Sequence, residues 1–323
     1  MKSIGLIIPY DYKLLSIAAI LDVFETVNRI YADNKQGLPF CIHILQTPEQ
    51  IGQMGSLFHS HPVESIYAEI TYNLVLIPSF TTSSIKDTVN RNQVFIPWLQ
   101  QQYKAGAEMA SFCTGAFLFG ATGLLNGKSA TTHVDACNAF AALFPLVYVK
   151  PGQTVTVDER CYVSGGSTST FHLLVLLVQK YCGNDIAIRI AKIFAIDMDR
   201  HVQSYFSTFR PNYTHNDDLV KKVQQKIENS YLEINTLDEI MKDIPASRRN
   251  MVRRFKQVTG VPPIAYLQHI RIETAKKQLE QTNQSISEVI SYTGYTDPKS
   301  FRKTFHKLVG MKPLEYREKF RVM

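Results

Sequence analysis

The sequence of 323 residues has few cysteines, and none of them are paired in a motif. The five cysteines are odd in number and scattered along the chain: Cys41, Cys113, Cys137, Cys161 and Cys182. Because no CxxC pair is present, the pattern argues against a disulfide framework and a zinc site, and it favours a reducing cytosol. His59 and His61 flank Ser60 without a third ligand near them, so we expect a surface loop there and no metal.

The sequence also has no apolar run typical of a targeting or membrane segment. The first apolar run is broken by Pro9 and Asp11 and is too short for a signal peptide. Residues 109–127 carry no charge, but they are rich in Gly and Thr, and glycines interrupt them. We interpret them as a buried strand, turn and helix, and we expect a cytoplasmic protein with no membrane partner and no cofactor.

The charge of the chain is unevenly distributed. Residues 1–216 contain 15 Lys+Arg and 15 Asp+Glu, whereas residues 217–323 contain 20 and 13, so the last third carries the whole net charge of +7. A neutral region joined to a basic one suggests that only the basic region binds a polyanion. A solvated basic surface is the alternative that charge alone leaves open.

Residues 1–206 alternate between two kinds of segment. Apolar runs of strand length occupy 3–10, 40–47, 72–80 and 107–113, and segments with helical spacing lie at 15–32 and 94–106. Strands that are apolar throughout and alternate with helices are typical of a parallel sheet covered on both faces. We therefore predict an α/β domain over 1–206. Residues 207–216 are polar and contain Pro211, which indicates a linker before a domain at 217–323.

The basic third contains a repeat of fifty residues. The matching pairs are Phe255 and Phe305, Gly260 and Gly310, Pro263 and Pro313, and Tyr266 and Tyr316. Each copy has a short helix, a tight break and a second helix, which is the helix-turn-helix arrangement. Ser247 and Asp297 are suitable N-caps for the second helices, and Gly260 and Gly310 are suitable C-terminal stops.

The second helix of each copy has an apolar face and a cationic face. The apolar positions are Met251, Phe255 and Val258 in the first copy and Phe301, Phe305 and Leu308 in the second. The outward faces are Arg249, Val252, Arg253 and Lys256, and Lys299, Arg302, Lys303 and His306. A major groove accepts a helix, and Arg and Lys bond to guanine edges. Two matching cationic faces therefore favour DNA binding over a merely solvated surface.

Residues 217–323 resemble the AraC/XylS family of bacterial transcription activators. The resemblance is carried by 247–317, "SRRNMVRRFKQVTGVPPIAYLQHIRIETAKKQLEQTNQSISEVISYTGYTDPKSFRKTFHKLVGMKPLEYR". It implies two helix-turn-helix units on a rigid linker helix at 262–281, placed in successive major grooves of promoter DNA, with RNA polymerase as a further partner. Arg249, Val252 and Arg253 would face bases from the first unit, and Lys299, Arg302 and Lys303 from the second. The stretch "EIMKDIPAS" departs from the family, so the turn of the first unit is less regular.

The first domain resembles the PfpI-type branch of the class I glutamine amidotransferase-like superfamily, in the domain order of GlxA-like regulators. The matching stretches are 21–25 ("LDVFE"), 113–133 ("CTGAFLFGATGLLNGKSATTH") and 144–145 ("FP"). The resemblance implies a flavodoxin-like sheet that serves as sensor and dimerisation domain, with Cys113 at a strand-to-helix elbow.

Catalysis by Cys113 is not expected, because the supporting residues differ from those of hydrolases in that superfamily. Thr114 replaces the histidine after the cysteine, Ser16 stands in place of a carboxylate, and 78–80 ("PSF") replaces a Gly-Gly oxyanion turn. His133 remains, with Asp135 able to orient it. We expect a ligand pocket formed by Cys113, Thr114, His133, Phe80 and Ser16. Whether the thiol binds ligand, senses redox state or is inert stays open.

The sequence thus predicts a regulator that binds specific DNA and whose first domain binds a small metabolite. No residue pattern decides between activation and repression of transcription. Two alternatives remain: a cysteine hydrolase or amidase with a DNA-binding appendage, and a constitutive DNA-binding protein whose first domain only dimerises. We expect a homodimer that is associated with the nucleoid when DNA is bound.

Overall fold

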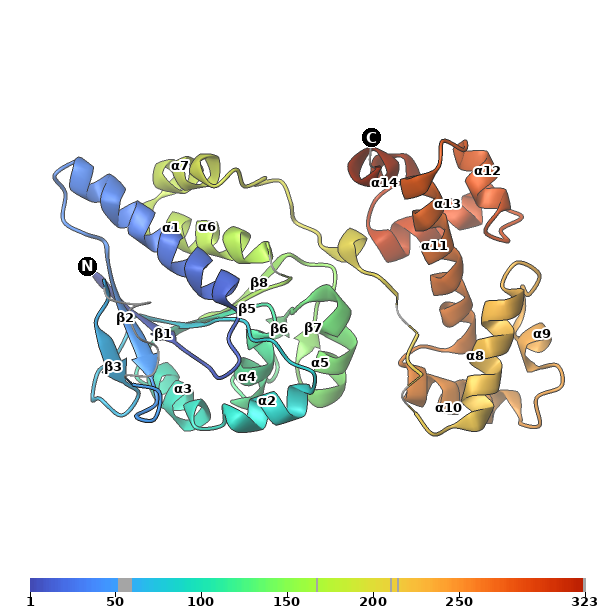
Figure 1. Cartoon of the computed structure of the whole chain (residues 1–323), viewed down its shortest axis with the longest axis horizontal. Coiled ribbons are helices and arrows are strands. Elements are labelled where there is room, and N and C mark those ends of the chain that lie inside the picture. Colours follow the sequence, from blue (N-terminus) through green and yellow to red (C-terminus); the bar gives the residue numbers. More distant parts are fainter. Residues whose placement is uncertain (52–59, 167, 210, 214, 322–323) are drawn as a thin grey trace. The chain divides into compact units, whose positions relative to one another are not determined.

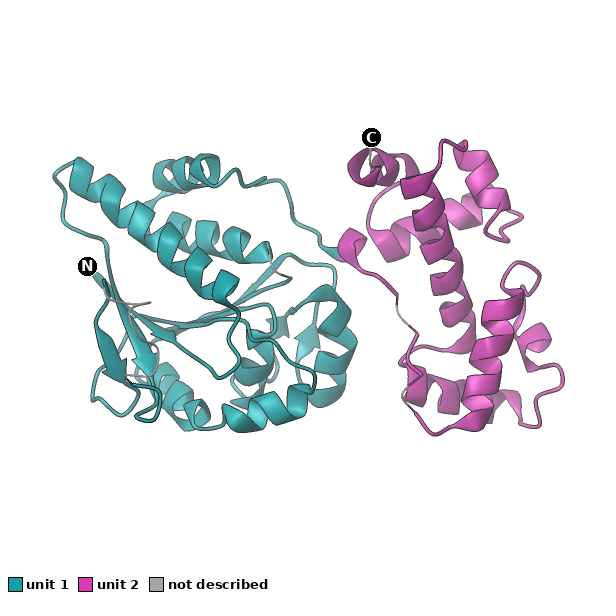
Figure 2. Ribbon diagram, in the orientation of Figure 1, with its two compact units in different colours: residues 1–203 teal, residues 204–323 magenta. Residues whose placement is uncertain are grey.

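The computed structural model describes residues 1–51, 60–166, 168–209, 211–213 and 215–321; His59 lies outside them. The chain divides into two compact units, residues 1–203 and 204–323 (Figure 2). This boundary precedes the one expected at 206, and the expected linker belongs to the second unit. The ring of Phe209 packs against those of Tyr266 and His269, at centroid distances of 5.1 and 4.6 Å.

The first unit is built on a seven-stranded sheet in the order β3-β2-β1-β4-β5-β9-β8. The strands are β1 (Lys2–Ile7), β2 (Phe40–Gln46), β3 (Val63–Ser65), β4 (Leu74–Ile77), β5 (Glu108–Phe112), β8 (Val155–Asp158) and β9 (Cys161–Ser164). All neighbours pair in parallel except β8, which is antiparallel to β9. The prediction of a parallel sheet is therefore wrong for this edge strand, because a short hairpin rather than a helix joins it to β9. β6 (Ser129–Ala130) and β7 (Tyr148–Val149) form a separate pair.

Helices cover both faces of this sheet (Figure 1). One layer contains α1 (Leu14–Asp33), α6 (Ser169–Cys182) and α7 (Asn184–Ile193). The other contains α2 (Ile85–Arg91), α3 (Phe95–Lys104), α4 (Gly115–Ala121) and α5 (Cys137–Leu143), the last preceded by the 3₁₀ turn η2 (Val134–Ala136). The sequence of β4 shows why the strands are apolar throughout. Leu74 and Leu76 enter one core and Val75 and Ile77 the other, so the strand has no solvent-facing side.

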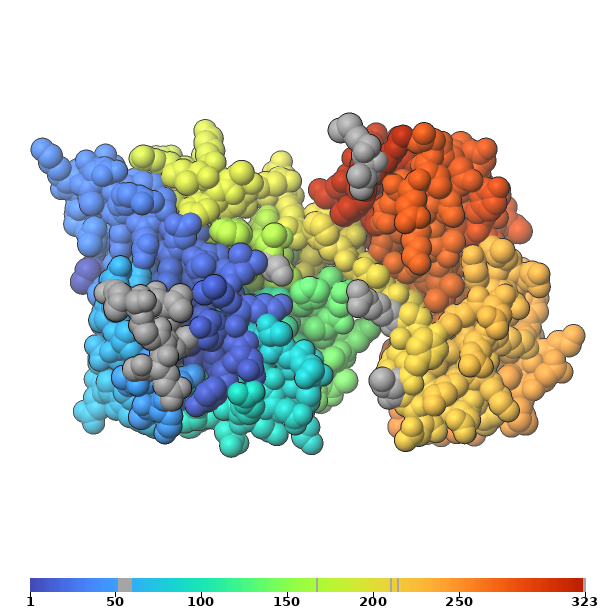
Figure 3. Space-filling model, in the orientation of Figure 1, coloured from blue at the N-terminus to red at the C-terminus, as the bar shows by residue number. Residues whose placement is uncertain are grey.

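The second unit is entirely helical in its described residues. Its helices are η3 (Ser204–Phe206), α8 (Asp218–Ser230), α9 (Leu237–Met241), α10 (Arg248–Thr259), α11 (Pro263–Gln281), α12 (Ile286–Ser291), α13 (Pro298–Val309) and α14 (Pro313–Phe320). The space-filling view shows α8 and α9 in one lobe and the red segments from α12 onward in another (Figure 3). α11 coincides with the linker helix implied by the resemblance, and the pairs α9–α10 and α12–α13 are the two helix-turn-helix units.

The fifty-residue repeat is reproduced in the local structure of the two helix-turn-helix units. Ser247 Oγ accepts a bond from Asn250 N, and Asp297 accepts from the backbone at the start of α13, so both predicted N-caps are confirmed. Gly260 and Gly310 end their helices with φ of 83° and 85°, the left-handed conformation that glycine adopts readily.

The packing inside each of the two helix-turn-helix units is also repeated. The Phe255 and Tyr266 rings meet edge to face at 5.3 Å, and those of Phe305 and Tyr316 at 5.7 Å. Met251 and Phe301 are fully buried as expected. Val258 and Leu308, which were expected to be buried, are only half-buried. In α13 the neighbouring Val309 takes the buried place instead.

The charge-free stretch at 109–127 forms the end of β5, a turn and α4, as interpreted from the sequence. Within the described residues, every helix is too short or too polar to cross a membrane.

Candidate DNA-binding surface and cysteine elbow

The outer face of α10 consists of the predicted side chains. Arg249, Arg253 and Lys256 are exposed and Val252 is half-buried, because residues three and four apart share one face of a helix. Burial of Met251 and Phe255 on the opposite face fixes this orientation. α10 contains no acidic residue, so nothing within the helix neutralises the cationic face.

The outer face of α13 has the same arrangement. Lys299, Arg302, Lys303 and His306 are exposed, and Phe301 and Phe305 anchor the opposite side. α13 also contains no acidic residue. The structure therefore presents two exposed cationic helix faces, and a major groove accepts a helix with such a face.

Other basic residues of the second unit have structural partners instead. Arg254 forms an ion pair with Asp217, which caps α8, and Arg248 pairs with Asp238. Two further basic residues, Arg271 and Lys276 on α11, were not identified from the sequence, and their side chains are buried. The available signal was spacing. Arg271 lies four residues from Leu267 and from Ala275, within the apolar stripe of α11.

The cysteine elbow between β5 and α4 is confirmed. Cys113 has φ of 52°, an uncommon value for a residue with a side chain, and it is 1% exposed. Two residues later the chain passes close to the end of β4. A Cβ on Gly115 would lie 2.6 Å from the carbonyl oxygens of Ile77 and Pro78, so only glycine fits.

Four of the five expected pocket residues lie together at this edge of the sheet: Cys113, Thr114, Phe80 and Ser16. Hydrogen bonds among their segments close the space in which a ligand was expected. Thr114 Oγ1 donates to Phe80 O (2.7 Å) and accepts from Phe80 N (3.0 Å). Ser16 Oγ accepts from the backbone of residue 79 at 3.1 Å. These bonds draw the turns after β1, β4 and β5 together, so Cys113 is covered rather than open to a ligand.

His133 lies on a neighbouring loop. Its Nδ1 accepts a hydrogen bond from the backbone N–H of Asp135 (3.3 Å), which orients the ring. The adjacent Thr132 Oγ1 donates to Cys113 O (2.8 Å). The loop therefore supports the elbow through the Thr132 hydroxyl group.

An open cleft of about 550 Å³ lies beside this closed region. It is lined by Asp11, Tyr12, Thr81, Thr82, Ser83, Ser84, Asp87, Thr88 and Arg91. These residues follow β1 and β4, the neighbouring strands at which the strand order reverses, and ligands of open α/β sheets bind at such a point.

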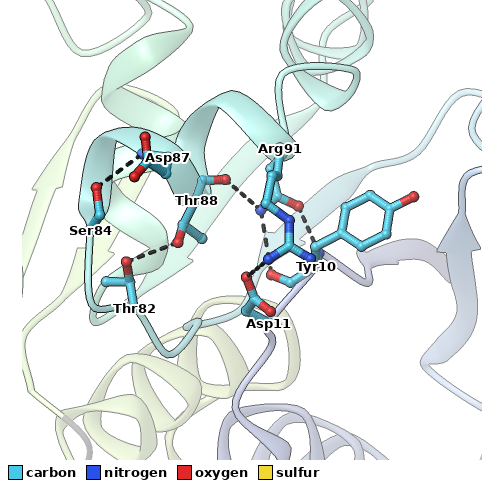
Figure 4. Close-up of polar contacts among 8 residues, drawn as sticks. Tyr10, Asp11, Thr82, Ser84, Asp87, Thr88 and Arg91 are labelled. Atoms are coloured by element: carbon cyan, nitrogen blue, oxygen red, sulfur yellow. Dashed lines mark hydrogen bonds and ion pairs between the residues drawn. The ribbon is translucent and has the colours of Figure 1, made fainter.

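The cleft is polar and preorganised (Figure 4). Arg91 Nη1 donates to Asp11 Oδ2 at 2.7 Å, and its guanidinium lies 5.6 Å from the centre of the Tyr10 ring. Thr88 Oγ1 donates to Thr82 Oγ1 at 2.8 Å. Asp11 has φ of 60°, a conformation found often at functional sites. In the described part of the chain, no three His, Cys, Asp or Glu side chains gather in a way that could hold a metal ion.

The fold and these surfaces define a two-domain protein, in which an α/β domain with a flavodoxin-like strand order precedes a domain with two helix-turn-helix units. A helix-turn-helix domain family matches residues 241–319.

Among relatives, GbdR of Pseudomonas aeruginosa, an HTH-type transcriptional regulator, is 25% identical over 72% of this chain and 63% of its own length. GlxA of Rhizobium meliloti, also an HTH-type transcriptional regulator, is 22% identical over 67% of this chain and 66% of its own. The match to GbdR thus spans less than two thirds of that relative.

A solved structure from Vibrio parahaemolyticus, described as a transcriptional regulator protein, covers 59% of this chain and 98% of its own with 21% identity and a TM-score of 0.50. DJ-1β of Drosophila melanogaster covers 61% of this chain and 98% of its own with 13% identity and a TM-score of 0.46. Residues 241–319 thus match a helix-turn-helix domain, and the chain is similar to the GbdR and GlxA regulators, in agreement with the resemblance predicted from the sequence.

Proposed function

We propose that the protein is a transcriptional regulator that binds promoter DNA through α10 and α13. The observation that carries this proposal is the pair of exposed cationic faces at equivalent positions of two repeated units, both joined to α11. Arg253 and Lys303 would contact base edges or phosphates from the two helices. One face alone is common on surfaces, but two in matching positions suit successive major grooves.

The primary test is a genome-wide binding map of the full-length protein in its source cell. Fragments recovered there then serve as probes in gel-shift titrations. We expect the logarithm of the affinity to fall steeply with the logarithm of salt concentration, because cationic side chains displace counterions from phosphates. Uniform recovery of the genome, with no enriched fragments, would contradict specific DNA binding.

The first unit would bind a small effector in the open cleft beside Cys113, rather than at the thiol. Three features support this placement: the position where strand order reverses, the Asp11–Arg91 ion pair, and a lining of hydroxyl groups. A ligand that separates Arg91 from Asp11 would satisfy both charged groups with its own polar atoms. It would alter DNA binding only if it favours one arrangement of the two units.

A thermal-shift screen against a panel of polar metabolites tests this effector site. A compound that raises the melting temperature of the wild-type protein should lose its effect in Arg91→Gln. The matched control is Arg189→Gln, which removes another exposed guanidinium, on α7. Equal stabilisation of all three proteins would place the ligand elsewhere, and no stabilisation by any compound would favour a first unit that only dimerises.

Hydrolase or amidase activity is not part of the proposed function. The side chains at the positions where a hydrolase would have catalytic groups are engaged in holding turns together, Thr114 with Phe80 and Ser16 with residue 79. Cys113→Ser should therefore leave ligand stabilisation and DNA binding within about twofold of wild type, since the substitution changes little volume. A rapid and selective alkylation of Cys113 would revive the enzyme alternative.

A further inference from the structure

Arg271 is a buried cation at the middle of α11. Its side chain is 6% exposed, and its guanidinium donates to neutral acceptors in the connection between α8 and α9. Nε donates to Tyr231 O (2.7 Å), and Nη2 donates to Ile234 O (2.8 Å) and to Asn235 Oδ1 (3.2 Å). Burial of a charge is costly unless it is fully hydrogen-bonded, so these contacts hold the connection against α11.

The other side of the same guanidinium contacts the second helix-turn-helix unit. Its central carbon lies 5.3 Å from the centre of the Tyr295 ring, in the turn between α12 and α13. Gly294, in the same turn, has φ of 74°. A Cβ there would lie 2.8 Å from both Arg271 Nη2 and Leu232 O. The α12–α13 turn of the second helix-turn-helix unit therefore packs directly on the connection between α8 and α9. Figure 1 shows both segments beside α11.

This contact links the two helix-turn-helix units, in addition to the continuous helix α11 that both of them contact. α11 alone would allow each unit to rock about its contacts with the helix. The guanidinium of Arg271 donates in fixed directions to the α8–α9 connection and also stacks against the Tyr295 ring, so one side chain contacts both segments at once. The close approach at Gly294 leaves no room for the turn to shift toward Leu232.

We propose that the Arg271–Gly294 contact locks α10 and α13 at one separation and rotational phase, and so determines the spacing between the two DNA half-sites that the protein accepts. This inference rests on the proposed DNA binding. Half-sites in register with both helices bind together, because the second contact benefits from a high effective concentration. A shift of register along the duplex also rotates the half-site around the axis and removes it from the groove.

Selection from a random duplex library with the full-length protein tests this proposal. The variants are Arg271→Met, which keeps the length but removes the donors, and Arg271→Lys, which restores one cationic group. Lys277→Met is the matched control, since Lys277 is exposed on the same helix. We expect wild type and Lys277→Met to enrich paired half-sites at one spacing, Arg271→Met at several, and Arg271→Lys at an intermediate distribution.

A quantitative measurement follows with the selected sequence. Insertion of a single base pair between the half-sites should weaken wild-type binding about tenfold or more, but weaken binding by Arg271→Met clearly less. Affinity for each isolated half-site should stay within about twofold for all variants, which a general loss of folding would not allow.

The outcomes are distinguishable. Retention of the single spacing and of the full insertion penalty by folded Arg271→Met would overturn the role of this contact. If that variant does not fold, Arg271→Lys and Asn235→Ala, which removes one acceptor, decide in the same way. Failure of wild type itself to enrich any sequence would instead contradict the proposed DNA binding.

Discussion

The two helix-turn-helix units have the same helices but differ in the turn. In the first unit the turn between α9 and α10 contains Asp243 with φ of 66°, whereas the second unit has Gly294 with φ of 74°. Lys226 donates to the carbonyl of Lys242 in the first turn (2.5 Å), and the second turn faces Arg271 and Leu232.

This difference shows that a repeated motif adapts to its neighbours. A residue with a side chain is tolerated in the left-handed conformation at Asp243, at a small conformational cost. At Gly294 a side chain would also strike backbone, so glycine is required for two reasons. The first turn, whose sequence "EIMKDIPAS" departs from the family, differs in structure as well. Only the α12–α13 turn takes part in the contact with Arg271 and Leu232 that joins the two helix-turn-helix units.

The largest expected effect concerns the equivalent aromatic anchors. Phe255→Ala and Phe305→Ala should each reduce the free energy of unfolding of the full chain by about 3–5 kcal/mol, because each ring is fully buried. Urea unfolding measured by circular dichroism provides the values. A much smaller effect at one position would show that the two cores are not equivalent.

The next largest effect concerns DNA contacts. Arg253→Ala and Lys303→Ala should each weaken binding to a cognate site by about 1–3 kcal/mol, and their comparison ranks the two units. Gel-shift titration at constant salt measures both, with Lys192→Ala on α7 as a control that removes one exposed charge from the first unit. An unchanged affinity in both variants would refute the assignment of the outward faces.

A smaller effect is expected at the helix caps. Ser247→Ala and Asp297→Ala should each lower the free energy of unfolding by about 1 kcal/mol, because each removes an acceptor for backbone N–H groups at a helix start. Asp297 accepts two such bonds and Ser247 one, so we expect the larger loss at Asp297 in thermal or urea unfolding. The reverse order would indicate that α13 is capped by other groups.

The smallest effect tests the turns themselves. Asp243→Gly should raise the free energy of unfolding by up to about 1 kcal/mol, because it relieves the left-handed conformation of a residue with a Cβ. Differential scanning calorimetry can resolve such a shift with Asp243→Ala as the control, which keeps the Cβ. Destabilisation by glycine would mean that the Asp243 side chain contributes more than its backbone costs.

Much of the architecture was predictable because it depends on local spacing. The apolar strands, the fifty-residue repeat, the caps and stops of α10 and α13, and the exposure of the cationic faces follow from periodicity and turn chemistry, whereas the cysteine elbow was implied by the family resemblance. The antiparallel direction of β8 was not predictable in this way, because an apolar run is compatible with pairing in either direction.

By itself, the sequence determined that the chain has an α/β domain and a basic helical domain, and which faces of two helices carry charge. Only the tertiary structure decided that Cys113 is covered while a polar cleft beside it is open, and that Arg271 lies buried between two helix-turn-helix units. These properties depend on contacts between segments far apart in the chain. Local spacing indicates which face of a helix is covered, but not which atoms cover it.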